Sequence, residues 1–377
     1  MYEYLMEDEV IEVVGALGFD RDVDGWVTPR RLPDWTRSQF ADLGMERHVR
    51  FPSGVRLRFT TNAETISLEV RVTKLEVTGF SEEKRPAAFD LLVNGIESKT
   101  VIAEHGNILR LTAITPALFS ESLELGEIDV LNFDGLGSET KDIEIWFPTT
   151  AIVEIRKIFA KQEIVKSKKD TRKTWLHYGS SISQCSEALR PMDAWPIRAS
   201  QLLNLNLRNF GLAGECQLDG FVARTMAELQ ADLISLKLGI NIVNADSMRE
   251  RAFIPAVHNF LDTLRNKHAR TPILIISAIV CPFHEDCPGP TMIDGNRLFG
   301  QVRATELATG ALTLKRTRTI LEEIVKKRSD SNLYFMDGLE LFNSTDRNHL
   351  PDDLHPDSLG YRMMGERFAR LQGQLFS

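Results

Sequence analysis

The chain has 377 residues, of which 43% are hydrophobic and 26% are charged. This composition is typical of a folded globular protein and excludes wholesale disorder or a fibrous repeat, and the length favours two domains. Because 53 acidic residues outnumber 45 basic ones, for a formal net charge of −8, the charge balance argues against a nucleic-acid-binding protein.

Hydrophobic residues recur mostly at every second position up to about residue 164, which predicts strands with one face on a core and the other in water. Residues 89–93 and 96–102 flank Asn94-Gly95, a pair that readily adopts the two positive φ angles of a tight hairpin turn. The other predicted strands are residues 54–59, 66–72, 127–133 and 142–147. With almost no helical stretch among them, these strands predict an all-β sandwich or jelly roll, mainly antiparallel.

The sequence KQEIVKSKKDTRK, residues 161–173, interrupts this pattern. A nucleic-acid-binding patch is one interpretation, but the segment has no interleaved aromatic residues and lies in an acidic protein, so a solvated linker or strand edge is favoured. We therefore predict a β-domain over residues 1–170 and a second domain over residues 171–377.

The second half alternates between short hydrophobic runs and helical periods, which predicts an α/β domain with a mainly parallel sheet covered on both faces. Candidate strands are residues 174–178, 205–210, 233–238, 273–279 and 333–336, and candidate helices are residues 194–203, 220–229, 249–267, 311–327 and 358–371. In the last helix, Leu359, Met363, Phe368 and Leu371 are expected to share one side. The active site of such a fold is expected at the carboxyl ends of the strands.

No hydrophobic run approaches the ~20 residues needed to span a bilayer, and the longest, residues 273–281, is too short. The first ten residues, MYEYLMEDEV, are acidic where a secretion signal would be basic and then apolar. We therefore expect a cytosolic protein that binds no membrane. Its four cysteines, Cys185, Cys216, Cys281 and Cys287, are then expected to be reduced thiols.

Gly179-Ser180-Ser181-Ile182 follows the first strand of this second half. A serine at a strand-to-helix turn exposes its hydroxyl at the edge of the sheet, and the following helix directs its positive end towards a developing oxyanion. Small residues also form ordinary turns, so Ser181 alone identifies no enzyme.

Leu350-Pro351-Asp352-Asp353-Leu354-His355-Pro356 lies near the other end of the chain. A histidine that acts as a general base needs a carboxylate to hold one tautomer and to stabilise the imidazolium that forms. Asp352 and His355, three residues apart in one loop, can meet this need locally. The alternative is a loop of helix-capping residues with a solvent-exposed histidine.

Two further strand ends carry groups that could donate hydrogen bonds to an oxyanion. Residues 209–214 end the second strand with glycines, and residues 238–241 end the third with an asparagine. The backbone N–H groups of Ser181 and Gly214 and the side-chain amide of Asn241 can supply the two or three donors that a tetrahedral acyl intermediate needs. Each residue alone is more often a turn glycine or a capping asparagine, but serine, glycine, asparagine and Asp–His at four successive strand ends favour acyl-transfer chemistry.

Other candidates follow the same strands. His284 and Glu285, after the fourth strand, are possible substrate contacts or parts of a loop. His177 is expected to be a buried, hydrogen-bonded histidine, Trp195 a core residue and His349 a loop residue. The histidines do not have a metal-ligand spacing and no phosphate-binding glycine loop is present, so neither a metal nor a cofactor is expected.

This set of residues resembles the SGNH (GDSL-type) hydrolases, a family named for its catalytic serine, oxyanion-hole glycine and asparagine, and histidine. The resemblance covers about residues 174–377. It implies a three-layer α/β/α, flavodoxin-like domain with Ser181 as nucleophile, His355 as base, Asp352 as its partner, and Gly214 and Asn241 as oxyanion donors. Two positions depart from the family pattern: Ser180 replaces the usual acid before the nucleophile, and Ile242 replaces an aspartate that often follows the asparagine.

The first half is similar to the β-sandwich that precedes the catalytic domain in a two-domain subgroup of the family, which includes bacterial esterases and an acyltransferase. The similar phrase is Ala88-Phe89-Asp90-Leu91-Leu92, followed by Val93-Asn94-Gly95. We therefore predict a serine esterase or acyl-transfer enzyme that acts on a small-molecule acyl ester or acylated sugar. Transfer of the acyl group to an alcohol of a secondary metabolite is the alternative, and a non-catalytic carbohydrate-binding protein is the alternative from another class; a homo-oligomer is left open.

Overall fold

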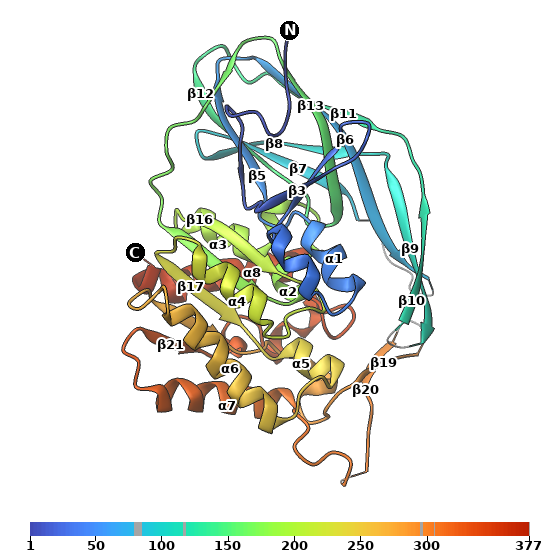
Figure 1. Ribbon diagram of the computed structural model, residues 1–377, viewed down its shortest axis with the longest axis vertical. Helices are drawn as coiled ribbons and strands as arrows, with labels where there is room; N and C mark the ends of the chain where they lie inside the picture. The colour runs from blue at the N-terminus through green and yellow to red at the C-terminus, as the bar shows by residue number, and fades with distance from the viewer. Residues whose placement is uncertain (79–84, 116–117, 295–296, 305, 377) are drawn as a thin grey trace. The chain divides into compact units, whose positions relative to one another are not determined.

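The computed structural model describes every residue of the chain except 79–84, 116–117, 295–296, 305 and 377 (Figure 1). The described residues fall into two compact units. The first unit comprises Met1–Trp35, Val49–Thr171 and Ser186–Ala194, and the second comprises Thr36–His48, Arg172–Cys185 and Trp195–Ser377.

Strands make up most of the first unit. They are β1 Tyr2–Tyr4, β2 Glu12–Val14, β3 Gly18–Arg21, β4 Val27–Arg30, β5 Arg56–Thr61, β6 Thr65–Val77, β7 Ala87–Val93, β8 Ile96–Ala103, β9 Asn107–Thr115, β10 Leu118–Glu124, β11 Asp129–Asp134, β12 Lys141–Trp146, β13 Ala151–Ala160 and β14 Ile164–Val165. One sheet has the order β10-β9-β6-β13-β4-β3, with β1 beside β13 and β11 beside β6, and the other has the order β14-β5-β12-β7-β8, with β2 beside β5. The predicted all-β fold of this half is confirmed, with one departure from antiparallel pairing, because β6 and β9 run parallel.

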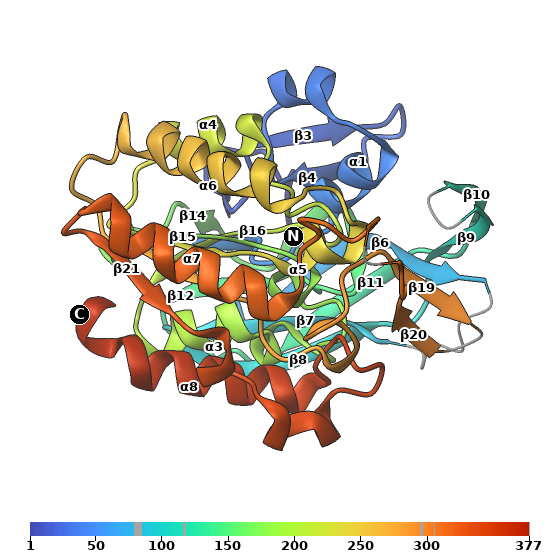
Figure 2. The same cartoon turned by 90° about the horizontal axis from the view of Figure 1, so that it is seen from below.

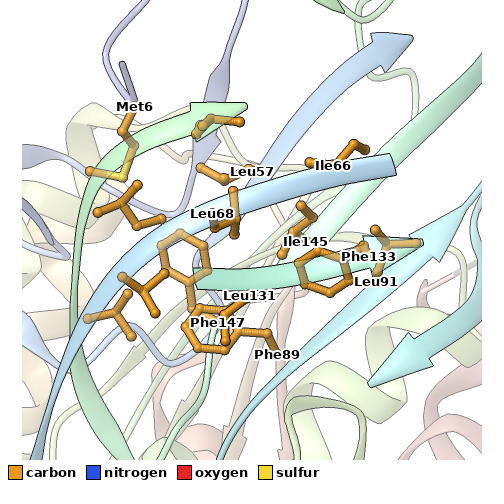
Figure 3. Packing of buried hydrophobic residues seen from close by; sticks show 14 of the residues in the cluster. Met6, Leu57, Ile66, Leu68, Phe89, Leu91, Leu131, Phe133, Ile145 and Phe147 are labelled. Atoms are coloured by element: carbon orange, nitrogen blue, oxygen red, sulfur yellow. The ribbon is translucent and has the colours of Figure 1, made fainter. Parts of the chain in front are cut away.

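The core of the first unit is built from the inward residues of both sheets (Figure 3). Leu57 and Phe59 of β5 and Ile145 of β12 pack with Leu68 of β6 and Phe133 of β11, and all five are fully buried. Alternation along these strands places the hydrophobic set on one face, as the two-residue period predicts. The predicted hairpin joins β7 and β8, where Asn94 and Gly95 have φ angles of 51° and 78°.

Two short segments belong to the other compact unit from the residues that directly precede them in the chain. In Ser186–Ala194, Arg190 Nε and the Met192 N–H donate to the fully buried carboxylate of Asp90, both at 2.9 Å, which ties this segment to β7 of the first unit. In Thr36–His48, the Phe40 ring lies 5.5 Å from that of Phe221 in the second unit. The sequence did not predict this exchange, because it depends on contacts between residues far apart in the chain.

A five-stranded parallel sheet forms the centre of the second unit, with the order β16-β15-β17-β18-β21. Its strands are β15 Thr174–Gly179, β16 Asn206–Gly211, β17 Leu233–Lys237, β18 Ile273–Ile276 and β21 Leu333–Met336, and a hairpin of β19 Thr291–Asp294 and β20 Arg297–Gly300 follows β18. Across both units, the α-helices of the described residues are α1 Leu43–Arg50, α2 Ser181–Gln184, α3 Trp195–Leu202, α4 Gly220–Glu228, α5 Ile240–Ala245, α6 Glu250–Arg265, α7 Leu314–Arg328 and α8 Ser358–Phe376. The 3-10 helices are Asp34–Gln39, Pro191–Asp193, Pro282–His284, Gly338–Glu340 and Ser344–His349.

Helices cover both faces of this sheet, as predicted (Figure 2). On one face, Trp175 of β15 stacks on Phe368 of α8 at 5.1 Å and lies 6.2 Å from Trp195 of α3. On the other face, Tyr178 stacks on Phe260 of α6 at 5.1 Å. The predicted fold class, a three-layer α/β/α domain after an all-β half, is confirmed.

Candidate active site

The loop and short helix after β15 carry Ser181. Gly179 is the last residue of β15, and Ser180 caps α2 by accepting a hydrogen bond from the Ile182 N–H through its hydroxyl, at 3.3 Å. Ser180 therefore provides an N-cap where the family pattern has an acid. Ser181 is the first residue of α2, and among the described residues no group accepts a hydrogen bond from its backbone N–H. This N–H is left available to an incoming group.

The structure brings Ser181, His355 and Asp352 together, although Ser181 and His355 are 174 residues apart. Ser181 Oγ lies 2.9 Å from His355 Nε2, and His355 Nδ1 lies 2.7 Å from Asp352 Oδ2. The other carboxylate oxygen, Oδ1, accepts hydrogen bonds from the backbone N–H groups of Leu354 and His355, at 2.9 and 2.6 Å. One oxygen thus fixes the loop and the other fixes the ring, an arrangement suited to a histidine that accepts a proton at Nε2.

The Asp352 carboxyl is ionised at neutral pH. Burial raises its pKa, but the charge of the His355 ring and the hydrogen bonds from His355 and Leu354 outweigh burial and lower the pKa to about 2. An ionised carboxylate beside Nδ1 stabilises the imidazolium that forms when Nε2 takes a proton.

Gly214 and Asn241 follow the two strands that flank β15 in the sheet. Gly214 has a φ of +76°, and its N–H donates to no described residue. Asn241, in the first turn of α5, accepts a hydrogen bond through Oδ1 from the Cys216 N–H at 3.1 Å, and no described residue accepts one from its Nδ2. Gln217 ties the two loops by donating through Nε2 to the backbone oxygens of Gly214 and Asn241, at 3.1 and 3.3 Å. Three donors at neighbouring strand ends are therefore left without an acceptor from the described chain.

His284 and Glu285 have contacts within the protein. His284 is fully buried, with Nδ1 3.0 Å from the Cys287 backbone oxygen and Nε2 2.7 Å from Thr291 Oγ1. Glu285 binds Arg318 through two contacts of 2.6 and 2.8 Å. Both His284 nitrogens and the Glu285 carboxylate thus have partners within the protein, and substrate contact by these two residues stays a prediction.

The expectations for His177, Trp195 and His349 agree with the structure. His177 is fully buried and hydrogen-bonded through both ring nitrogens, to Ser235 Oγ at 2.7 Å and to Ser183 Oγ at 2.8 Å. Trp195 is fully buried in the core, and His349 lies in a loop helix with Nδ1 3.1 Å from Asp357 Oδ2. Sequence reasoning missed Ser183, whose only signal was its place two residues after Ser181.

Sequence reasoning also missed Glu215, the residue after Gly214. The position where a Cβ atom on Gly44 would lie is 2.3 Å from Glu215 Oε1 and 2.9 Å from Asp42 Oδ1, so the two carboxylates are close neighbours. Burial, and then the charges of Asp42 and Asp219, raise the pKa of Glu215 to about 7, although Arg47 acts in the opposite direction.

Replacing Glu215 with glutamine is expected to stabilise the protein at alkaline pH. Because the folded-state pKa is raised from 4.5 to about 7, ionising Glu215 costs folding free energy that is absent below pH 4.5 and complete above about pH 7. With allowance for solvent at this half-buried group, the gain for Glu215→Gln is about 1–2 kcal/mol near pH 8, or a few degrees in Tm. Thermal unfolding at about pH 5 and pH 8 measures it.

Glu340→Gln, at an exposed glutamate of the same unit, is the matched control and should leave Tm unchanged at both pH values. A Glu215→Gln variant whose Tm difference from the wild type is the same at both pH values would contradict the raised pKa.

The described residues contain no candidate metal centre and no candidate membrane-spanning helix. No group of three or more histidine, cysteine, aspartate or glutamate side chains there is arranged to hold a metal ion. Within the same ranges, no helix combines the length and hydrophobicity needed to cross a membrane.

Comparison with known proteins gives a family match for part of the chain. Residues 172–284 match the model of the GDSL-like Lipase/Acylhydrolase family, a range that contains Ser181, Gly214 and Asn241. No curated protein sequence matches the chain. Together with the α/β/α fold, this match makes the segment similar to GDSL-like hydrolases.

The match of residues 172–284 to a GDSL-like lipase/acylhydrolase model supports an ester-acting serine hydrolase or acyl-transfer enzyme, as the sequence resemblance predicted.

Several solved structures share the fold over nearly the whole chain. The salicylyl-acyltransferase SsfX3 from a tetracycline biosynthetic pathway is similar with a TM-score of 0.80 and 23% identity, covering 99% of this chain and 97% of that one. A putative GDSL-like lipase from Bacteroides ovatus has a TM-score of 0.65 and 19% identity, covering 97% and 96%. A family two carbohydrate esterase from Clostridium thermocellum has a TM-score of 0.59 and 13% identity, covering 97% and 98%. At these identities the likeness concerns the fold.

Proposed function

We propose that this chain is a serine esterase that cleaves an O-acyl ester through an acyl-enzyme on Ser181. The observation that carries the proposal is the hydrogen-bonded series from the Ser181 hydroxyl through the His355 ring to the Asp352 carboxylate, with distances of 2.9 and 2.7 Å. A hydroxyl is a weak nucleophile at neutral pH, and an adjacent base that accepts its proton activates it.

The first half of the reaction forms the acyl-enzyme. Ser181 Oγ bonds to the carbonyl carbon of the ester as His355 Nε2 takes the hydroxyl proton. His355 then returns that proton to the oxygen of the leaving alcohol as the carbon–oxygen bond of the ester breaks. Asp352 remains ionised throughout and stabilises the imidazolium between these two proton transfers.

The second half of the reaction releases the acyl group. A water molecule attacks the carbonyl carbon while His355 Nε2 takes one of its protons, and the bond to Ser181 Oγ then breaks as His355 returns the proton to Oγ. In both halves the negative oxygen is bound by the N–H groups of Ser181 and Gly214 and by the Asn241 amide. These three donors have no acceptor among the described residues, which supports this role.

The substrate class proposed is an acylated sugar or another small acylated metabolite. Among the structures of similar fold, a family two carbohydrate esterase was solved in complex with cellohexaose.

Transfer of the acyl group to an alcohol is the second candidate, because the acyl-enzyme is common to both reactions. It is favoured by one observation, the similarity in fold over nearly the full length to a salicylyl-acyltransferase. A non-catalytic carbohydrate-binding protein is disfavoured by the hydrogen-bonded Ser181, His355 and Asp352.

The proposal is tested by mixing the protein with p-nitrophenyl acetate. We expect steady release of nitrophenol, preceded by a burst of about one nitrophenol per protein molecule when the acyl-enzyme is hydrolysed more slowly than it forms. Nitrophenol release no faster than with the heat-denatured protein, for acetyl and for longer acyl esters, would contradict an esterase.

Adding a primary alcohol at graded concentration then separates hydrolysis from transfer. An esterase gives mainly the free acid at every alcohol concentration, and an acyltransferase gives the new ester in proportion to the alcohol. The products are quantified by chromatography.

A further inference from the structure

A continuous series of buried hydrogen bonds runs from the core of the second unit to the turn that carries Ser181. Trp175 Nε1 donates to Ser235 Oγ at 2.8 Å, and Ser235 Oγ lies 2.7 Å from His177 Nδ1. His177 Nε2 lies 2.8 Å from Ser183 Oγ. All four side chains are fully buried, and Ser183 is two residues beyond Ser181 in α2.

Helix α2, which contains Ser183, is not stable without contacts to the rest of the protein. α2 has four residues, and a single helical turn is unstable in isolation because few hydrogen bonds offset the conformational entropy that it loses. Buried side chains of the second unit hold it instead. Asn209 Nδ2 donates to the Ser183 backbone oxygen at 2.8 Å, and Trp195 Nε1 donates to the Ile182 backbone oxygen at 2.9 Å.

Gly179 leaves the space in which the Ser183 hydroxyl lies. A Cβ atom at Gly179 would lie 2.2 Å from Ser183 Oγ and 3.4 Å from His177 Nε2. The backbone of β15, the His177 ring and the Ser183 hydroxyl therefore form one close contact directly beneath the turn.

We propose that His177 and Ser183 are positioning residues for the nucleophile: their buried hydrogen bond sets the orientation of α2 and hence the place of Ser181 Oγ relative to His355 Nε2. The proposal rests on the proposed function of Ser181. Neither residue is catalytic, because both are enclosed by the core and neither is bonded to Ser181 or His355.

The His177 ring is expected to be neutral, which suits a residue that connects two hydroxyl groups by hydrogen bonds. Burial, and then the charge of nearby Lys237, lower its pKa to about 3. A neutral imidazole donates through one nitrogen and accepts through the other, which matches two hydroxyl partners. Because the ring does not titrate in the range where the enzyme would work, its loss is expected to change the size of the rate and not the shape of its pH profile.

Ser183→Ala tests the proposal with the smallest change. The substitution removes one hydroxyl and keeps the rest of the turn, and misplacement of a reacting atom by about 1 Å can cost about 100-fold in rate. We expect kcat for p-nitrophenyl acetate to fall about 10- to 100-fold, KM to change less than about threefold, and the pH profile to keep its shape.

Ser200→Ala is the matched control. Ser200 is also fully buried in the second unit and donates one short hydrogen bond, to the Ile197 backbone oxygen at 2.7 Å within α3, and among the described residues it forms no hydrogen bond with α2. We expect it to lower Tm about as much as Ser183→Ala and to leave kcat unchanged. Rates are expressed per active site, counted by fluorophosphonate labelling carried to completion, so that partial unfolding cannot imitate a loss of kcat.

Two variants of His177 give an independent test. The amide nitrogen of glutamine can take the place of Nε2 and reach Ser183, whereas the amide of asparagine corresponds to Nδ1 and reaches only Ser235. His177→Gln is therefore expected to retain several-fold more kcat than His177→Asn at equal active-site count. A Ser183→Ala variant with the kcat of Ser200→Ala, or equal rates for the two His177 variants, would overturn the proposal.

Failure of the proposed function gives a different result. If Ser181→Ala retains the turnover of the wild type, Ser181 is not the nucleophile and the proposed function fails, whatever Ser183→Ala does. If Ser181→Ala is inactive and Ser183→Ala is fully active, the proposed function stands and the positioning role is wrong.

Discussion

Replacing Ser181 with alanine is expected to lower kcat for a small chromogenic ester by about 10⁴-fold or more, because no covalent intermediate can then form. The fold should persist, since Ser181 Oγ hydrogen-bonds only to His355 among the described residues. Steady-state hydrolysis of p-nitrophenyl acetate, with circular dichroism as a check on folding, measures the effect.

Ser180→Ala is the matched control for this substitution, because it removes the same hydroxyl one residue earlier. Ser180 is buried and caps α2, so its loss should lower stability by about 1 kcal/mol and kcat by less than about tenfold. Equal losses of activity in the two variants would contradict the choice of Ser181 as nucleophile.

Asp352→Asn is expected to lower kcat about 10²- to 10⁴-fold. The asparagine amide cannot stabilise the imidazolium as a carboxylate does, and it favours the tautomer of His355 that places the proton on Nε2, where it cannot serve as a base towards Ser181. His355→Gln should lose at least as much, since it removes the base itself. In the wild type, the low pKa of about 2 predicts that no loss of activity above about pH 4 arises from protonation of Asp352.

The neighbouring aspartate provides the control. Asp353 binds Arg347 at the surface, with contacts of 3.0 and 3.2 Å, and Asp353→Asn should change kcat less than about twofold. If Asp353→Asn were as damaging as Asp352→Asn, the loop as a whole and not the Asp352–His355 contact would be responsible. Measurement of kcat over the pH range for all three variants distinguishes these cases.

The sequence predicted the fold class of the second half and residues that the structure brings together, and the physical reason is local. Ser181, Gly214 and Asn241 each follow a strand whose hydrophobic run is plain in the sequence, and parallel strands bring their carboxyl ends to one edge. Asp352 and His355 meet within one loop. Only the position of that loop beside Ser181 could not be predicted without the structure.

Features that depend on distant contacts were missed or misplaced. The side chain of His284 turns inward because the β19–β20 hairpin supplies Thr291 as its partner, and neither the hairpin nor the pairing has a sequence signal. The last helix was predicted, but the prediction of its buried face was wrong. Leu359 and Leu371 are 51% and 40% exposed, whereas Tyr361, Met364 and Phe368 are fully buried. Hydrophobic periodicity predicted the helix but not which of its faces packs against α3.

The hydrogen bonds beneath α2 were also beyond sequence reasoning. His177 was expected to be buried and bonded, but its partners, Ser235 and Ser183, come from a neighbouring strand and from the nucleophile turn. Pairing of β15 with β17 places His177 opposite Ser235, and this register is fixed only when the sheet forms.

Reaction with a fluorophosphonate, followed by peptide mass spectrometry, tests the central claim most directly, because the reagent phosphorylates only a serine that a neighbouring base has activated. We predict one adduct per chain, on Ser181, that is absent in Ser181→Ala and greatly slowed in His355→Gln. A fully folded protein that remains unlabelled, or that carries its adduct on another serine, would contradict the account.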